Sequence, residues 1–211
     1  MRGKAMERVF VWQLPVRFFH WINALCIVAL GMTGFLIGRP LVFASSGEPW
    51  AGYWFGTVRF IHFSVAYLLI FNFLFRIYWG FVGNKYATWR NFIPLRASQW
   101  KEILRVLRYF LSFLVFLAQV ATGLALYSAM SEFGMGRLFA WVIPLFGSDL
   151  AVRQWHHLLM WFFPAFIITH VYLVFYHDYV EGRGGTSSMV GGFKFIERPT
   201  EPRSPAPSAK E

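Results

Sequence analysis

The amino-acid sequence reads RQWHHLLMWFFPAFIITH from Arg153 to His170. Aliphatic and aromatic side chains dominate this stretch. Together with the residues after it, the stretch is long enough to cross a bilayer, which takes about 20 residues as a helix. Histidine within a membrane-spanning helix is costly and is usually functional. Arg153 lies three residues before His156, so the two side chains share one helix face, with the arginine one turn nearer the helix end.

The same Arg-x-x-His phrase occurs twice more, at Arg17–His20 and at Arg59–His62, and each copy begins a long apolar segment. The chain is 57% hydrophobic and 14% charged, whereas about a quarter of the residues in soluble domains are charged. We therefore predict an all-α integral membrane four-helix bundle in the lipid bilayer, with spans at about 16–37, 57–81, 109–130 and 155–179.

The net charge of +10 is distributed as in a membrane protein and does not point to a nucleic-acid partner. Most lysines and arginines precede the first span, lie between spans two and three, or follow the fourth span. The exceptions are Arg39, Arg59, Arg137 and Arg153. Because cytoplasmic loops are enriched in these residues, we predict that both termini are cytoplasmic.

The domain organisation that we expect is a transmembrane unit at residues 1–185 and a cytoplasmic tail at 186–211 whose end is disordered. Cys26 is the single cysteine, so an internal disulfide and covalent c-type haem attachment are excluded. Thr33-Gly34 in the first span is echoed by Thr122-Gly123 in the third. Because the third span has no histidine, we do not expect this echo to extend to metal ligands.

Four histidines fall into two pairs according to their expected depth in the membrane. Successive spans run in opposite directions, which places His62 and His156 near the outer face and His20 near the cytoplasmic face. His170 follows His156 by fourteen residues, about 21 Å along a helix and within about 40° of the same face. His20 and His170 therefore form an inner pair. Two imidazoles at one depth are the axial ligands that one haem b needs, so we predict two bis-histidine haems. His157 points away from His170 and is the weaker candidate.

Arginines and glycines near these histidines favour haem, although each has another interpretation. Haem carries two propionates, which suit the guanidinium fork. We assign Arg59 and Arg153 to the outer pair and Arg17 to the inner one, with Arg76 either at the inner haem or reaching cytoplasmic water. Snorkelling at helix ends remains the alternative. Gly31 and Gly34 return to the His20 face at the height of the outer haem. There they would admit the porphyrin or simply allow close helix packing.

The acidic residues lie outside the spans or at their ends. Proton pumps and many ion carriers need buried carboxylates. The chain also lacks a cluster of nucleophile and base. These features favour an electron carrier over a pump or a hydrolytic enzyme. The alternative from another class is a haem-free membrane anchor or transporter whose histidines pack or bind substrate.

The chain resembles the b-type cytochrome subunit of membrane-bound nickel–iron hydrogenases. The resemblance rests on several phrases taken together, which are Pro15-Val16-Arg17 with His20-Trp21, Thr33-Gly34-Phe35, Arg59 with His62-Phe63, Arg76-Ile77-Tyr78-Trp79 with Val82-Gly83-Asn84, Trp155-His156-His157-Leu158, His170-Val171-Tyr172, and Ser187-Ser188-Met189-Val190.

This resemblance implies a dihaem cytochrome in the bacterial inner membrane, with haem ligands at His20, His62, His156 and His170. It implies partners on the periplasmic side, the hydrogenase small subunit with its large subunit. Electrons from hydrogen would pass through the small subunit's iron–sulfur clusters to haem and then to quinone. The chain would then be a non-catalytic subunit of a hydrogen:quinone oxidoreductase, with a quinone-reducing site and oligomerisation of the complex left open. The runner-up is the cytochrome b subunit of a formate dehydrogenase or a related respiratory enzyme.

Overall fold

The computed structural model describes residues 6–39, 53–88, 103–131, 134–181 and 185–197. Four helical segments are long and apolar enough to cross a membrane. They are α1 (Leu14–Gly38), α2 (Trp54–Val82), α3 (Ile103–Ser128), and α5 (Asp149–Met160) continued by α6 (Phe162–Glu181). The prediction of a mostly helical fold with four helices that could span a membrane is confirmed.

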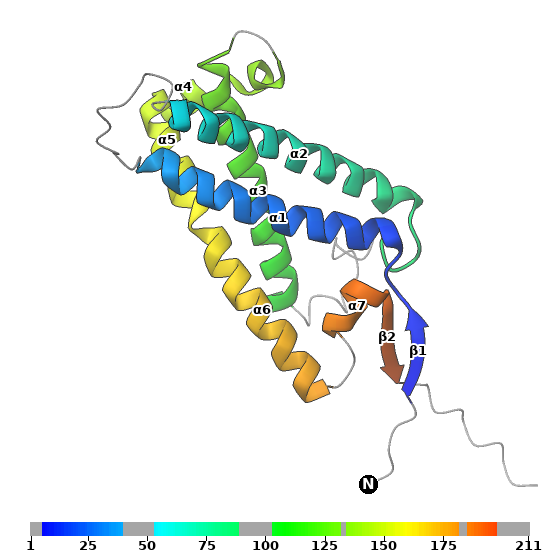
Figure 1. Ribbon diagram of the computed structural model, residues 1–211. Helices are drawn as coiled ribbons and strands as arrows, with labels where there is room; N and C mark the ends of the chain where they lie inside the picture. Colours follow the sequence, from blue (N-terminus) through cyan, green and yellow to red (C-terminus); the bar gives the residue numbers. More distant parts are fainter. Residues whose placement is uncertain (1–5, 40–52, 89–102, 132–133, 182–184, 198–211) are drawn as a thin grey trace, which may run out of the picture.

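The helices are arranged as packed pairs. The first two, α1 and α2, lie side by side, α3 packs against α5, and α1 also contacts α5 and α6 (Figure 1). Large apolar side chains point outward from these helices, including Leu25, Phe60 and Ile168, each at least 70% exposed. Such a surface is suited to lipid, and the helical backbone satisfies its own hydrogen bonds there.

The fourth span is interrupted at Trp161, between α5 and α6. The cause is Pro164, which has no N–H to give to the Met160 carbonyl and whose ring crowds that carbonyl. Pro164 therefore accounts for the break in the fourth span. The break separates the helix that carries His156 from the helix that carries His170.

Two short helices cover one end of the bundle: a 3-10 helix, η4 (Met135–Phe139), and α4 (Val142–Phe146). Val142 of α4 is buried with Ala125 of α3 and Val152 of α5. This small cluster fixes the relative position of α3 and α5, the two helices that approach the outer histidine pair.

The two termini of the described chain meet at the other end of the bundle. Strand β1 (Met6–Phe10) pairs antiparallel with β2 (Phe193–Glu197), and α7 (Gly185–Gly191) precedes β2 (Figure 1). Gly192 joins α7 to β2 at φ 84°, where a Cβ would lie 2.7 Å from the Phe10 ring and 2.8 Å from the Trp12 carbonyl. The turn therefore requires glycine. This strand pair was not predicted from the sequence, and the predicted disordered end lies outside the described residues.

Polar side chains join α1 to α2 near the strand pair. The Gln13 side-chain oxygen Oε1 accepts hydrogen bonds from the Trp79 indole N–H (3.2 Å) and the Asn84 backbone N–H (3.1 Å). Buried Asn72 donates its amide N–H to the Phe19 carbonyl at 3.1 Å. These bonds hold the segment of α1 that carries His20.

Candidate functional site

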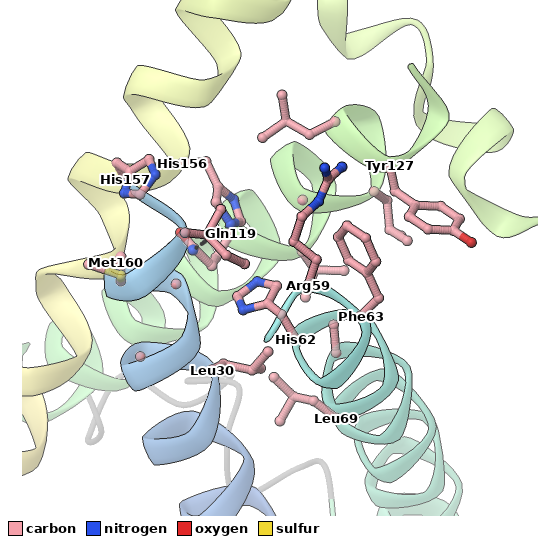
Figure 2. Close-up of a pocket in the computed structure, with 18 of the residues that line it drawn as sticks. Leu30, Arg59, His62, Phe63, Leu69, Gln119, Tyr127, His156, His157 and Met160 are labelled. Atoms are coloured by element: carbon pink, nitrogen blue, oxygen red, sulfur yellow. Dashed lines mark hydrogen bonds between the residues drawn. The ribbon is translucent and has the colours of Figure 1, made fainter. Parts of the chain in front are cut away.

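An apolar cavity of about 450 Å³ opens among α1, α2, α3 and α5. Its volume falls within the usual range for cofactor pockets, roughly 300–1,000 Å³. The labelled side chains from these helices converge on it in Figure 2. All six residues assigned to the outer site line the cavity: Gly31, Gly34, Arg59, His62, Arg153 and His156.

His62 enters the cavity from α2 and is held by α1. Its Nδ1 lies 2.8 Å from the Thr33 hydroxyl oxygen. A Cβ added at Gly34 would lie 3.4 Å from His62 Cε1, so the ring passes close to the α1 backbone. The ring is therefore fixed by one polar and one steric contact with the same helix.

His156 enters the cavity from α5 and is held by α3. Its Nδ1 lies 2.9 Å from the Thr122 hydroxyl oxygen, and its Nε2 lies 3.2 Å from the Gln119 amide nitrogen. Gln119 Oε1 is buried without a hydrogen-bond partner among the described residues. Sequence reasoning missed Thr33, Thr122 and Gln119, although the Thr-Gly echo marked both threonines.

The two glycines have different surroundings. A Cβ at Gly31 would meet nothing within 4 Å, so this residue faces open space in the cavity. A Cβ at Gly34 would lie 3.2 Å from the Met160 sulfur as well as close to His62. Space for a flat ring therefore exists beside Gly31, whereas Gly34 is already in contact with side chains of α2 and α5.

Both outer arginines border the cavity. The Arg59 guanidinium contacts the Met130 sulfur and lies 6.0 Å from the centre of the Phe63 ring. Arg153, on the first turns of α5, is exposed at the rim. Two cations at the edge of an apolar pocket form a suitable environment for anionic groups of a ligand.

The inner pair also comes together. The ring centres of His20 on α1 and His170 on α6 are 6.3 Å apart, with the ring planes inclined by 45°. Two imidazoles that each bind one metal at about 2 Å have ring centres about 6 Å apart. His20 Nδ1 is buried and has no hydrogen-bond partner in the described part of the chain. The pair is therefore spaced for axial ligation of a single metal.

The two arginines assigned to the inner side have backbone partners. Arg17 donates from Nη1 to the Val190 carbonyl of α7, and its Nε is buried without a partner among the described residues. Arg76 donates to the Ala87 carbonyl at 3.1 Å, and its guanidinium lies 5.8 Å from the centre of the Phe19 ring. Both side chains therefore hold the segments that surround the inner pair.

The residues present fit a haem at both places. At the outer place, both imidazoles have an Nδ1 partner, which leaves each Nε2 as the candidate ligand atom, and the cavity offers apolar space between four helices. At the inner place, the ring centres of His20 and His170 are separated as two imidazole ligands of one metal would be. The described residues contain no group of three or more His, Cys, Asp or Glu placed to hold a bare metal ion.

The four apolar spans and the two histidine pairs indicate a helical integral membrane protein of the membrane-cytochrome class. The chain belongs to the prokaryotic cytochrome b561 family, which it matches over residues 11–192.

Relatives with curated names cover most of the chain. A probable Ni/Fe-hydrogenase B-type cytochrome subunit of Azotobacter vinelandii is 38% identical over 219 residues, covering 90% of this chain and 89% of the relative. The subunit of the same name in Cupriavidus necator is 35% identical, covering 91% and 89%. A probable Ni/Fe-hydrogenase 1 B-type cytochrome subunit of Escherichia coli K12 is 32% identical, covering 88% and 90%.

Proposed function

We propose that this chain is the membrane electron-transfer subunit of a nickel–iron hydrogenase. In this role it carries electrons from the periplasmic hydrogenase through two b haems to the quinone pool and anchors the hydrogenase to the inner membrane. The observation that carries the proposal is the meeting of histidines in two separate pairs, His62 with His156 around one cavity and His20 with His170 at 6.3 Å. The names of the relatives supply the partner, a Ni/Fe hydrogenase.

The chain's own residues have distinct parts in this function. Haem, when bound, would supply a reversible one-electron change, and ligation by two imidazoles would suit electron transfer rather than oxygen binding. His62 and His156 hold the outer haem, and His20 and His170 hold the inner one. Arg59 and Arg153 bind the outer propionates, and the apolar lining of the cavity excludes water.

The direction of transfer follows from the charge distribution of the chain. With both termini cytoplasmic, the outer pair lies near the periplasm, within reach of the small subunit's clusters. The inner pair then lies near the cytoplasmic face and passes electrons on to quinone. The described part of the transmembrane unit has no carboxylate deep in a span, so the role assigned to the chain is electron transfer without proton pumping.

The test uses the purified complex and single His→Ala variants. The reduced-minus-oxidised spectrum should show two b haems in the parent. His62→Ala and His156→Ala should each remove the outer haem, and His20→Ala and His170→Ala the inner one, so that haem content is halved in every case. Unchanged haem in all four variants would overturn the proposal.

The partner is tested separately by what copurifies with the chain. Nickel and hydrogen-dependent reduction of the haems would support the hydrogenase. Molybdenum or tungsten with formate-dependent reduction would instead identify the chain as a formate dehydrogenase subunit.

A further inference from the structure

The two Thr-Gly dipeptides of the sequence make equivalent contacts in the structure. Thr33 of α1 contacts Nδ1 of His62 at 2.8 Å, and Thr122 of α3 contacts Nδ1 of His156 at 2.9 Å. In both cases the dipeptide lies on one span and the histidine lies on the next span along the chain. The repeated dipeptide therefore marks two copies of one arrangement. In each copy, a helix contacts and orients the histidine of the next span along the chain.

The glycine of each dipeptide makes room for the ring. A Cβ at Gly34 would lie 3.4 Å from Cε1 of His62, and a Cβ at Gly123 would lie 3.1 Å from Cε1 of His156. The same ring atom approaches the same position of the dipeptide in both copies. The second copy is the tighter one.

The threonine hydroxyls also fix the direction of the hydrogen bonds. Thr33 Oγ1 lies 2.7 Å from the Ala29 carbonyl, and Thr122 Oγ1 lies 2.7 Å from the Ala118 carbonyl. A hydroxyl has one proton to donate, and a carbonyl can only accept, so each hydroxyl gives its proton to the backbone. Each threonine must then accept a hydrogen bond from the histidine. Both imidazoles therefore carry their proton on Nδ1 and keep a free electron pair on Nε2.

Gln119 gives independent support for this tautomer at His156. Its amide N–H₂ group, which can only donate, lies 3.2 Å from His156 Nε2. Nε2 is therefore an acceptor here, as the Thr122 contact requires.

We propose that Thr33 and Thr122 are positioning residues for the outer haem. Each fixes the tautomer and the ring orientation of one histidine, so that its Nε2 electron pair would be available to the iron. This inference rests on the proposed function. A hydrogen-bonded Nδ1–H makes imidazole a stronger electron donor, and losing such a partner typically costs about 10–100-fold in metal affinity.

The test compares Thr33→Val and Thr122→Val with Thr57→Val in the purified complex. Valine keeps the shape of threonine and removes the hydroxyl. Thr57 is a suitable control because its hydroxyl also contacts the carbonyl four residues earlier, at 3.3 Å, and it lies on an exposed face of α2. The measurements are the reduction potential of each haem and the rate at which haem is released to an excess of a soluble haem-binding protein.

We expect Thr33→Val and Thr122→Val to raise the potential of the outer haem, since a weaker donor stabilises the oxidised iron less. Haem release from the outer site should be about 10–100-fold faster. The inner haem should be unchanged, and Thr→Ser should restore both values. The inner-haem spectrum reports whether a variant has folded, and Thr→Ala replaces Thr→Val where it has not.

The proposal fails if both variants match Thr57→Val in potential and in release rate. This outcome is distinct from failure of the proposed function. If His62→Ala and His156→Ala keep two haems, the outer haem assignment itself is wrong. If they lose the outer haem while the threonine variants behave as the control, only the positioning role is wrong.

Discussion

The imidazole ring of His157 lies directly against the backbone of Gly38, so closely that a methyl group at residue 38 would overlap the ring. The neighbouring His156 has different partners, Thr122 at Nδ1 and Gln119 at Nε2. Two consecutive histidines on α5 therefore have separate tasks. His157 packs α5 against the end of α1, and His156 is held by α3 at both of its ring nitrogens.

This division predicts different phenotypes for the two histidines. His157→Ala should keep both haems, with a loss of stability of about 1–3 kcal/mol from the lost packing. His156→Ala should lose the outer haem. Haem-to-protein ratio and the reduced spectrum measure the difference. If His157→Ala lost a haem and His156→Ala did not, the axial ligand would have to be reassigned to His157.

Gly31 offers a test of where the porphyrin lies. The structure leaves open space at this position, so Gly31→Leu should fold and insert into the bundle while filling part of the cavity. We expect it to lose the outer-haem signal and keep the inner one. Gly56→Leu is the matched control, because a Cβ there meets only Tyr53, at 3.9 Å. Normal outer-haem content in Gly31→Leu would show that the ring does not occupy the space beside this residue.

Sequence periodicity and hydropathy were sufficient for the spans because each span satisfies its own backbone hydrogen bonds and needs only length and apolarity. They were insufficient for β1 and β2, which are five residues each and pair across almost the whole chain. No local sequence pattern indicates which distant segment such a short strand pairs with.

As with the fold, the sequence predicted part of each candidate site and missed the rest. Depth alone paired His20 with His170, and the structure brings these two rings together. The Thr-Gly echo was recognised, and the third span has no histidine of its own, but the sequence did not reveal that each threonine contacts a candidate histidine. The echo acts across helices, since Thr122 contacts a histidine of the following span. Arg17 was assigned to a propionate from its spacing alone, and spacing could not reveal its bond to the Val190 carbonyl.

The contacts of α7 predict a selective effect of removing the C-terminal segment. Arg17 and Trp21 flank His20 and donate to the carbonyls of Val190 and Met189, the latter at 3.1 Å, so α7 covers the inner pair. Deletion of residues 185–211 should expose the inner haem and increase its rate of reduction by dithionite severalfold, with the outer haem unchanged. Deletion of residues 198–211 alone is the control, since it keeps α7 and β2. Equal reduction rates in the two deletions would contradict a covering role for α7.

The arginines at the rim of the outer cavity predict a shift in reduction potential. A positive charge near a haem favours the reduced state, because reduction removes one positive charge from the iron. Arg59→Gln and Arg153→Gln should therefore lower the potential of the outer haem. At an effective dielectric constant near 20, a charge several ångströms away contributes about 1–2 kcal/mol, which corresponds to tens of millivolts for one electron.

Arg39→Gln is the matched control for these two changes, because Arg39 is exposed just beyond the end of α1 and does not line the cavity. The measurement is a potentiometric titration in which the two haems are resolved by their spectra. A larger shift for the double Arg59→Gln, Arg153→Gln variant than for either single change is expected if both guanidinium groups face the same haem. A shift confined to the inner haem, or one equal to that of Arg39→Gln, would mean that the two arginines serve only to anchor helix ends at the membrane surface.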